Sequence, residues 1–134
     1  MSERDIAAYL ARAKESLDGA VSEYANGRYN NSANRAYYAC FQAAIAALMR
    51  EGITPPNRGS RWGHEFVHAR FVGDLIDRRR RYPATMRNVL AQAMELRLVA
   101  DYKTERVAAI SATRGLDRAR SFVEAVSENG ETQS

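Results

Sequence analysis

The chain has 134 residues, and the 46% that are hydrophobic are enough to build the core of one domain. Its formal net charge of +4 is a modest excess that favours contact with phosphates without requiring it. Every apolar run is broken well before the roughly 18 residues that a membrane-spanning helix needs. The charged N-terminus lacks the apolar core of a secretory signal, so we expect a soluble, cytoplasmic protein with no membrane contact.

Cys40 is the only cysteine, which excludes an internal disulfide and a cysteine-based zinc cluster. Its apolar neighbours Ala39 and Phe41 predict a small buried thiol rather than a nucleophile.

Two helices are predicted in the first half of the chain. From Glu3 to about Asn26, apolar residues recur at steps of three or four and share one face, and Gly27 is a natural stop. A second helix from about Tyr29 to Glu51 has a broad apolar face and ends at Gly52. Residues 53–63 then hold two prolines, two glycines and no periodicity, which indicates an exposed loop of functional interest.

Three more helices are predicted in the second half. A shorter one runs from about His64 to Arg80, where its arginine-rich end would complement the helix dipole. Pro83 suits the first turn of a fourth helix that continues to about Lys103. Thr104 is the candidate cap of a fifth helix.

The fifth apolar face ends at Val126, and the polar residues 128–134 are expected to form a disordered tail. No alternating strand pattern of useful length and no internal repeat is present. We therefore expect an all-α antiparallel bundle of four to five helices, forming one domain over residues 1–127.

Four motifs, in the same order along the chain, resemble those of small prokaryotic HEPN proteins. Residues 35–44 read RAYYACFQAA, which is similar to their RAYYAxFxAA signature. The other three matches are HEFV at 64–67, RLVADY at 97–102 and ARSFV at 119–123. The resemblance covers almost the whole chain. It implies a helical domain that commonly dimerises, is often encoded beside a small nucleotidyltransferase, and is associated with toxin–antitoxin pairs, antiviral defence and RNA cleavage.

Many active members of that family resemble one another in an Arg followed, after four to six residues, by a His. Here Tyr102 stands at the plausible His position after Arg97, and no His follows. Arg58 with His64 and Arg61 with His68 do satisfy the spacing. Because arginine is abundant in this chain, we interpret that spacing as accidental.

RNA cleavage without a metal needs a proton acceptor for the 2′-OH, a proton donor for the leaving oxygen and a cation beside the phosphate. The candidate catalytic residues are His64, Arg97, Asp101 and Tyr102. His64 is alternatively a capping or packing group at a helix start. Arg97 and Asp101, four residues apart, alternatively form only a surface ion pair. A partly buried network of Arg35, Arg97, Asp101 and Tyr38 or Tyr102 is our preferred interpretation, lining a phosphate or nucleotide pocket.

A second set of side chains is predicted to bind RNA or phosphate, through charge or by stacking. It comprises Arg35, Arg58, Arg61, Trp62, His68, Arg78, Arg79, Arg80 and Arg81. Trp62 is the aromatic residue that we expect to stack on bases, whereas the tyrosines fit a core or a dimer interface. His64 and His68 lack a third ligand in sequence, so no metal site and no cofactor is predicted.

Three functions remain open from the sequence. The first is a metal-independent endoribonuclease of a toxin–antitoxin or defence module, with its site completed by homodimerisation. The second is a non-catalytic HEPN protein that binds nucleotide, RNA or a nucleotidyltransferase antitoxin; a purely structural adaptor is a third. The missing His after Arg97 counts against the first, whereas the loop arginines, the two histidines and Trp62 favour it.

Overall fold

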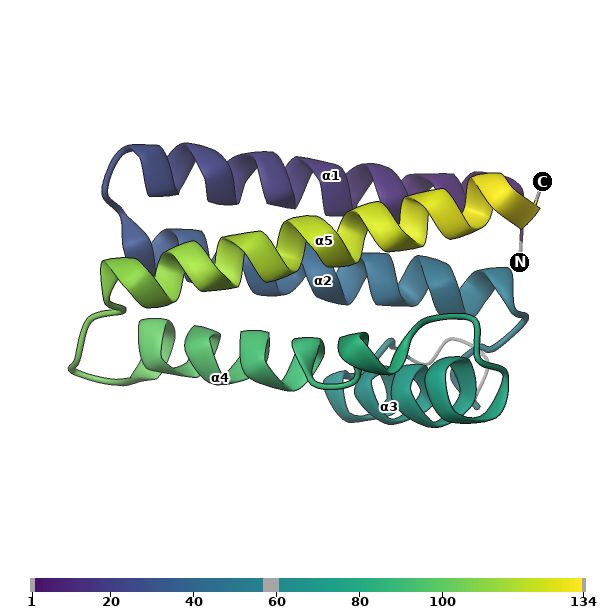
Figure 1. Cartoon of the computed structure of the whole chain (residues 1–134). Helices are drawn as coiled ribbons and strands as arrows, with labels where there is room; N and C mark the ends of the chain where they lie inside the picture. The colour runs from purple at the N-terminus through teal and green to yellow at the C-terminus, as the bar shows by residue number, and fades with distance from the viewer. Residues whose placement is uncertain (1, 57–60, 134) are drawn as a thin grey trace.

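The computed structural model describes residues 2–56 and 61–133, and within them it contains five α-helices and no strand. In chain order the elements are α1 (Glu3–Ala25), α2 (Tyr29–Arg50), α3 (His64–Arg70), the π-helix η1 (Phe71–Arg78), the 3-10 turn η2 (Ala84–Met86), α4 (Val89–Tyr102) and α5 (Ala109–Gln133). Helices α1, α2 and α5 lie side by side, and α3 and α4 follow each other along one side of α2 (Figure 1). The predicted all-α bundle is confirmed. No helix in the described part of the chain is long and apolar enough to cross a bilayer.

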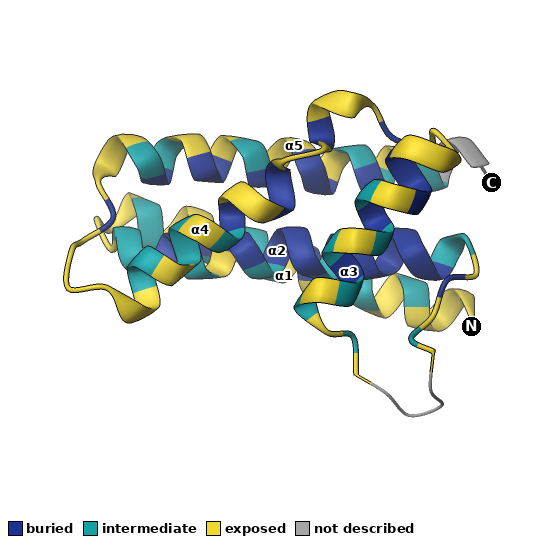
Figure 2. Ribbon diagram, turned by 90° about the horizontal axis from the view of Figure 1, so that it is seen from below, coloured by how far each residue is buried: buried dark blue, intermediate teal, exposed yellow. Residues whose placement is uncertain are grey.

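Helix α2 is central, because it packs against α1, α3, α4 and α5. Small side chains allow this close approach: Ala13 and Ala20 of α1 and Ala39 and Ala43 of α2 are all fully buried. Seen from the side that α3 and α4 cover, the buried residues of these two helices face α2 and their exposed residues face outward (Figure 2). Cys40 is also fully buried, which raises the pKa of its thiol to about 12 and confirms the predicted buried thiol.

The ends of α1 follow from its sequence. The Ser2 hydroxyl accepts a hydrogen bond from the Asp5 backbone N–H at 3.2 Å, and the Asp5 carboxylate accepts one from the Ser2 backbone N–H at 3.5 Å. This capping box satisfies two donors that the first turn leaves free. Gly27 and Gly52 follow α1 and α2 with φ of +72° and +75°, so both predicted stops are confirmed.

The third predicted helix is not one continuous α-helix. The segment expected as an α-helix over residues 64–80 becomes a π-helix after Arg70. Asp74, only 8% exposed, accepts from the Arg70 side chain and lies 3.5 Å from Nη1 of Arg78. The π-helix ends where the Arg79 backbone N–H donates to the Asp74 carbonyl, five residues back, at 2.8 Å.

Two predicted helix starts also differ. Pro83 is extended and precedes the turn η2, so α4 begins only at Val89 rather than in the turn that contains Pro83. Thr104 lies outside any helix and does not cap α5. The backbone N–H of Val107 donates instead to Oδ1 of Asn30 on α2, at 2.9 Å, which fixes the connection between α4 and α5.

Helix α5 continues to Gln133, so a helix occupies residues 128–133 where the sequence predicts a disordered tail. Two hydrogen bonds hold this end: Asn129 Nδ2 donates to the Arg81 carbonyl at 2.9 Å, and Arg50 Nη1 donates to the Val126 carbonyl at 3.0 Å. Polar composition predicts poor packing, but these long-range contacts attach the last turns to the bundle.

Candidate active site

A buried tyrosine joins both histidines of the chain. The Tyr37 hydroxyl oxygen lies 2.6 Å from Nδ1 of His64 and 2.9 Å from Nε2 of His68. His64 and His68 are one helical turn apart at the start of α3, so both rings reach the same point on α2. The Tyr37 ring is fully buried, and Phe41 one turn later packs against His64 with ring centroids 4.7 Å apart. We call Tyr37, His64 and His68 the bridged cluster.

The bridged cluster is uncharged near neutral pH. Burial raises the pKa of Tyr37 far above its ordinary value, so the phenol keeps its proton. Burial lowers the pKa of His64, and the positive charge of Arg97 lowers it further. The pKa of His68 is lowered by burial and then by His64.

One hydroxyl between two ring nitrogens couples the two tautomers. The Tyr37 hydroxyl has a single proton to donate, so one imidazole accepts from it while the other donates an N–H to its oxygen. If Tyr37 donates to His68, then His64 carries its proton on Nδ1 and its Nε2 is a free proton acceptor. If Tyr37 donates to His64, then Nε2 of His64 carries the proton and is a donor. The same geometry therefore supports a hydrogen-bond acceptor form and a donor form of Nε2 of His64.

Arg97 of α4 supplies a cation beside the cluster. Its guanidinium carbon lies 5.6 Å from the centroid of the Tyr37 ring and 5.2 Å from that of Tyr38. Arg97 Nε donates to Oδ2 of Asp101 at 3.2 Å, and the same oxygen accepts from Asn34 Nδ2 at 2.9 Å. The Arg97 side chain is only 14% exposed, so its position is fixed by these contacts.

Two members of the expected network lie elsewhere. Arg35 is exposed and lines a hollow between α1 and α2 with Arg12 and Glu15, so it does not join Arg97 and Asp101. Its neighbour Asn34 takes that place. Tyr102 is 71% exposed at the end of α4, and within the described residues none of the contacts that hold the cluster involves it.

The predicted phosphate-binding arginines separate into two groups. Arg58 lies outside the described residues, whereas Arg61 lines a hollow beside the cluster together with Trp62. The block 78–81 follows the far end of η1, roughly 20 Å along the helix axis from His64.

Acidic partners hold three arginines of that block. Arg78 pairs with Asp74 at 3.5 Å, and Arg79 and Arg81 pair with Glu51 at 3.5 and 2.9 Å. The two pairs with Glu51 attach the turn after η1 to the end of α2, and the Arg78–Asp74 pair lies within η1, so all three arginines already have a structural role.

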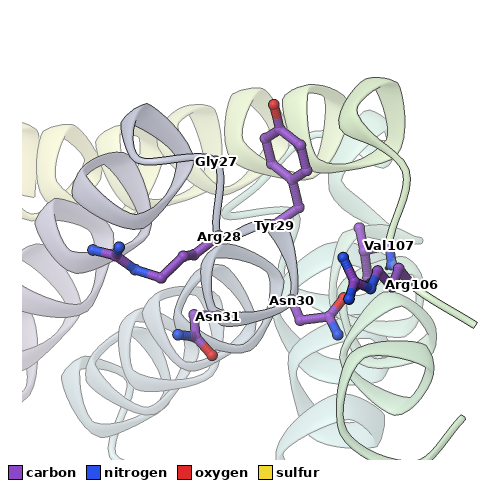
Figure 3. A pocket seen from close by; sticks show the side chains of 7 residues that line it. All are labelled: Gly27, Arg28, Tyr29, Asn30, Asn31, Arg106 and Val107. Atoms are coloured by element: carbon purple, nitrogen blue, oxygen red, sulfur yellow. Dashed lines mark hydrogen bonds between the residues drawn. The ribbon is translucent and has the colours of Figure 1, made fainter. Parts of the chain in front are cut away.

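Another hollow is separate from the cluster. It lies at the start of α2, where Tyr29 and Asn30 meet Val107 (Figure 3). Of its two cations, Arg106 extends toward Asn30, whereas Arg28 extends away from both in this view and is paired with Glu23. The side chains therefore do not converge on one ligand.

Sequence reasoning missed the central role of Tyr37, which it assigned to the core or to a dimer interface. A signal was present: Tyr37 shares the apolar face of α2 with Ala33 and Cys40, and a buried hydroxyl needs a hydrogen-bond partner. Asn34 was missed for a different reason, since it is an ordinary polar residue by pattern. Within the described residues, no three His, Cys, Asp or Glu side chains are placed to hold a metal ion.

Comparison with known proteins gives the family. A putative toxin of Methanocaldococcus jannaschii is 26% identical over 125 residues, which cover 91% of this chain and 86% of that protein. The HEPN domain model matches residues 6–129, a range that includes the bridged cluster, Arg97 and Asp101. Since the match spans the bundle from α1 to α5, the chain belongs to the HEPN domain family.

Proposed function

We propose that this chain is the toxin of a toxin–antitoxin or defence module and that it acts as a metal-independent endoribonuclease. The similarity to a putative toxin supports the first part. The observation that carries the second part is the Tyr37 hydroxyl bonded to both His64 and His68 beside Arg97. Neutral imidazoles next to a fixed cation are the groups that 2′-OH-dependent cleavage of RNA requires.

In this mechanism His64 takes the proton of the 2′-OH on its free Nε2. The 2′-oxygen attacks the phosphorus, a 2′,3′-cyclic phosphate forms, and the bond to the 5′-oxygen breaks. Arg97 binds the non-bridging oxygens and stabilises the charge that develops on them. The N–H at Nδ1 of His64 keeps its hydrogen bond to the Tyr37 oxygen, and this bond holds the ring in the tautomer whose Nε2 accepts a proton.

The leaving 5′-oxygen needs a proton from the opposite side of the phosphorus. A homodimer supplies it if His64 of the partner subunit carries a second proton, so that the imidazolium gives its Nε2 proton to the 5′-oxygen and returns to the neutral ring. Leu98 and Tyr102, four residues apart on α4, are 41% and 71% exposed and form an apolar surface close to Arg97 along the helix. We propose this face of α4 as the dimer contact.

The test is RNA cleavage in the presence of EDTA by purified wild type and two variants. His64→Ala is expected to lower the rate by about 10²–10⁴-fold, the usual effect of removing a proton-transfer group. Arg120→Ala is the matched control, because Arg120 is an exposed arginine of α5 paired only weakly with Asp117 at 3.9 Å. Equal cleavage by both variants, at equal thermal stability, would exclude His64 as the acid–base group.

One observation favours the second candidate, a non-catalytic protein that binds nucleotide, RNA or a nucleotidyltransferase antitoxin. The carboxylate of Asp101 is bonded to Arg97 and offsets part of the charge that a phosphate would meet. Asp101→Asn tests this offset, because removing the carboxylate should strengthen phosphate binding by Arg97. If wild type cuts no RNA without metal but binds a nucleotide or a nucleotidyltransferase, the binding function replaces the nuclease.

A further inference from the structure

A hollow of about 530 Å³ opens beside the bridged cluster, within the range of about 300–1,000 Å³ that is typical of small-molecule sites. We call it the aromatic hollow. It is lined by Tyr9, Tyr38, Phe41, Gln42, Ile45, Arg61 and Trp62. Its four aromatic side chains come from α1, from α2 and from the segment before α3, so the fold rather than one helix brings them together.

The aromatic hollow has a buried floor and partly exposed walls. Phe41 and Ile45 of the floor are 8% and 2% exposed. Tyr9, Tyr38 and Trp62 pack on the core but remain partly open to solvent. Partly exposed ring faces over an apolar floor are suited to stack on another flat ring.

Positive charge surrounds the same hollow. Arg61 is part of its lining, and the guanidinium of Arg12 lies 4.8 Å from the centroid of the Tyr9 ring. Arg97 lies 5.2 Å from the centroid of Tyr38 on the side of the cluster. None of the described residues that line the hollow is acidic. The matching occupant is a flat aromatic group that carries negative charge, which describes a nucleobase with its phosphate.

The aromatic hollow is continuous with the bridged cluster. The Phe41 ring of its floor is 4.7 Å from the His64 ring, and Tyr38 is 5.4 Å from Tyr37, centroid to centroid. A base in the hollow would therefore have a neighbouring phosphate close to His64.

We propose that the aromatic hollow is a nucleobase subsite, which stacks one unpaired base of single-stranded RNA against Trp62, Tyr9 and Tyr38 while Arg61 binds the adjacent phosphate. The subsite rests on the proposed RNA cleavage, because it selects an unpaired base next to the phosphate that is cut. It gives the enzyme a preference for single-stranded over duplex RNA, since a paired base cannot enter.

Binding can be measured without cleavage. Trp62 is the only tryptophan, so the intrinsic fluorescence excited at the tryptophan band reports on this hollow alone. The probe is a hexamer of 2′-O-methyl adenosine, which lacks the nucleophilic 2′-OH, and the comparison probe is an abasic hexamer with the same phosphates. We expect the first to quench Trp62 fluorescence and to bind more tightly than the second at equal salt.

Variants assign the effect to the rings. Tyr9→Ala is expected to weaken binding of the base-bearing hexamer by roughly 5- to 150-fold, the usual effect of removing one stacking ring. Tyr29→Ala is the matched control, since Tyr29 is a partly exposed tyrosine that lines a different hollow. Arg61→Ala is expected to weaken both hexamers and to reduce the salt dependence of binding.

Three results would overturn the subsite: equal affinity for the two hexamers, equal effects of Tyr9→Ala and Tyr29→Ala, or Trp62 fluorescence that changes with protein concentration but not with RNA. The last would assign the hollow to a protein interface instead. The outcome is independent of catalysis, because the probe cannot be cut. Whether the protein is a nuclease is tested separately, by comparing wild type with His64→Ala on cleavable RNA.

Discussion

Replacing Tyr37 by Phe removes one hydroxyl and keeps the ring that fills the core. The hydroxyl holds His64 at 2.6 Å and His68 at 2.9 Å, so both imidazoles lose a partner at once. The change therefore separates packing from hydrogen bonding, which Tyr37→Ala would not do because it would also leave a large cavity.

The expected loss of stability follows from where the two nitrogens lie. A typical intramolecular hydrogen bond contributes a net of about 0.5–1.5 kcal/mol. Both imidazoles are only partly buried, so water replaces part of each lost bond. We expect Tyr37→Phe to cost about 1–2 kcal/mol. For 134 residues, at about 2.1 cal/mol/K each, this lowers Tm by about 4–7 °C.

The assays are thermal melting, metal-free RNA cleavage and the ¹⁵N chemical shifts of the two imidazoles. Cleavage should fall by about 10–100-fold, as it does when the partner that orients a functional imidazole is lost. Tyr82→Phe is the matched control: Tyr82 is only 6% exposed, and burial raises its pKa to about 12, but it lies outside the bridged cluster. If Tyr37→Phe leaves Tm, cleavage and the imidazole shifts unchanged, the hydroxyl does not bridge the histidines.

The remaining predictions concern pH and assembly. Burial, and for His64 also the charge of Arg97, lowers the pKa of His64 and His68 below the ordinary value of 6.5, so the unfolded chain binds more protons. Stability should therefore fall as pH decreases below about 6.5. Replacing both histidines by Gln should flatten the plot of Tm against pH above pH 5. A flat plot for wild type would refute this. Wild type should have a dimer mass by light scattering at micromolar concentration, and Leu98→Glu should be monomeric because it places a charge on the exposed apolar face of α4 beside Tyr102. A monomeric wild type contradicts the dimer-completed site.

Much of the fold could be predicted because the first two helices have regular periods and clear stops. Gly27 and Gly52 adopt the left-handed conformation that their positions predict. The third helix could not be predicted in detail, since the eight residues of η1 are too few for the hydrophobic pattern to distinguish a π-helix from an α-helix. The ion pairs of Asp74 with Arg70 and Arg78 span four residues, as in an α-helix, so they do not reveal the π-helix either.

The candidate site was predictable only where its contacts are local. Arg97 and Asp101 are four residues apart, so their ion pair follows from helix geometry. The choice between Asn34 and Arg35 depended on the helical phase of α2 against α4, because adjacent residues point about 100° apart. A one-residue difference in that phase places Asn34 against Asp101 and turns Arg35 toward α1.

The use of two imidazoles on one hydroxyl is more than folding alone requires. A buried tyrosine needs one partner, which a backbone carbonyl, a serine or a glutamine would provide equally well. Two histidines with lowered pKa add a desolvation cost. Apolar side chains would fill the same space without that cost. What they do add is proton transfer near neutral pH, at a point that Arg97 makes attractive to phosphate. By contrast, ion pairs to Asp74 and Glu51 account for three arginines of the block 78–81. We therefore propose a functional role for the bridged cluster and a structural role for these three arginines, although both sets looked alike as candidates in the sequence.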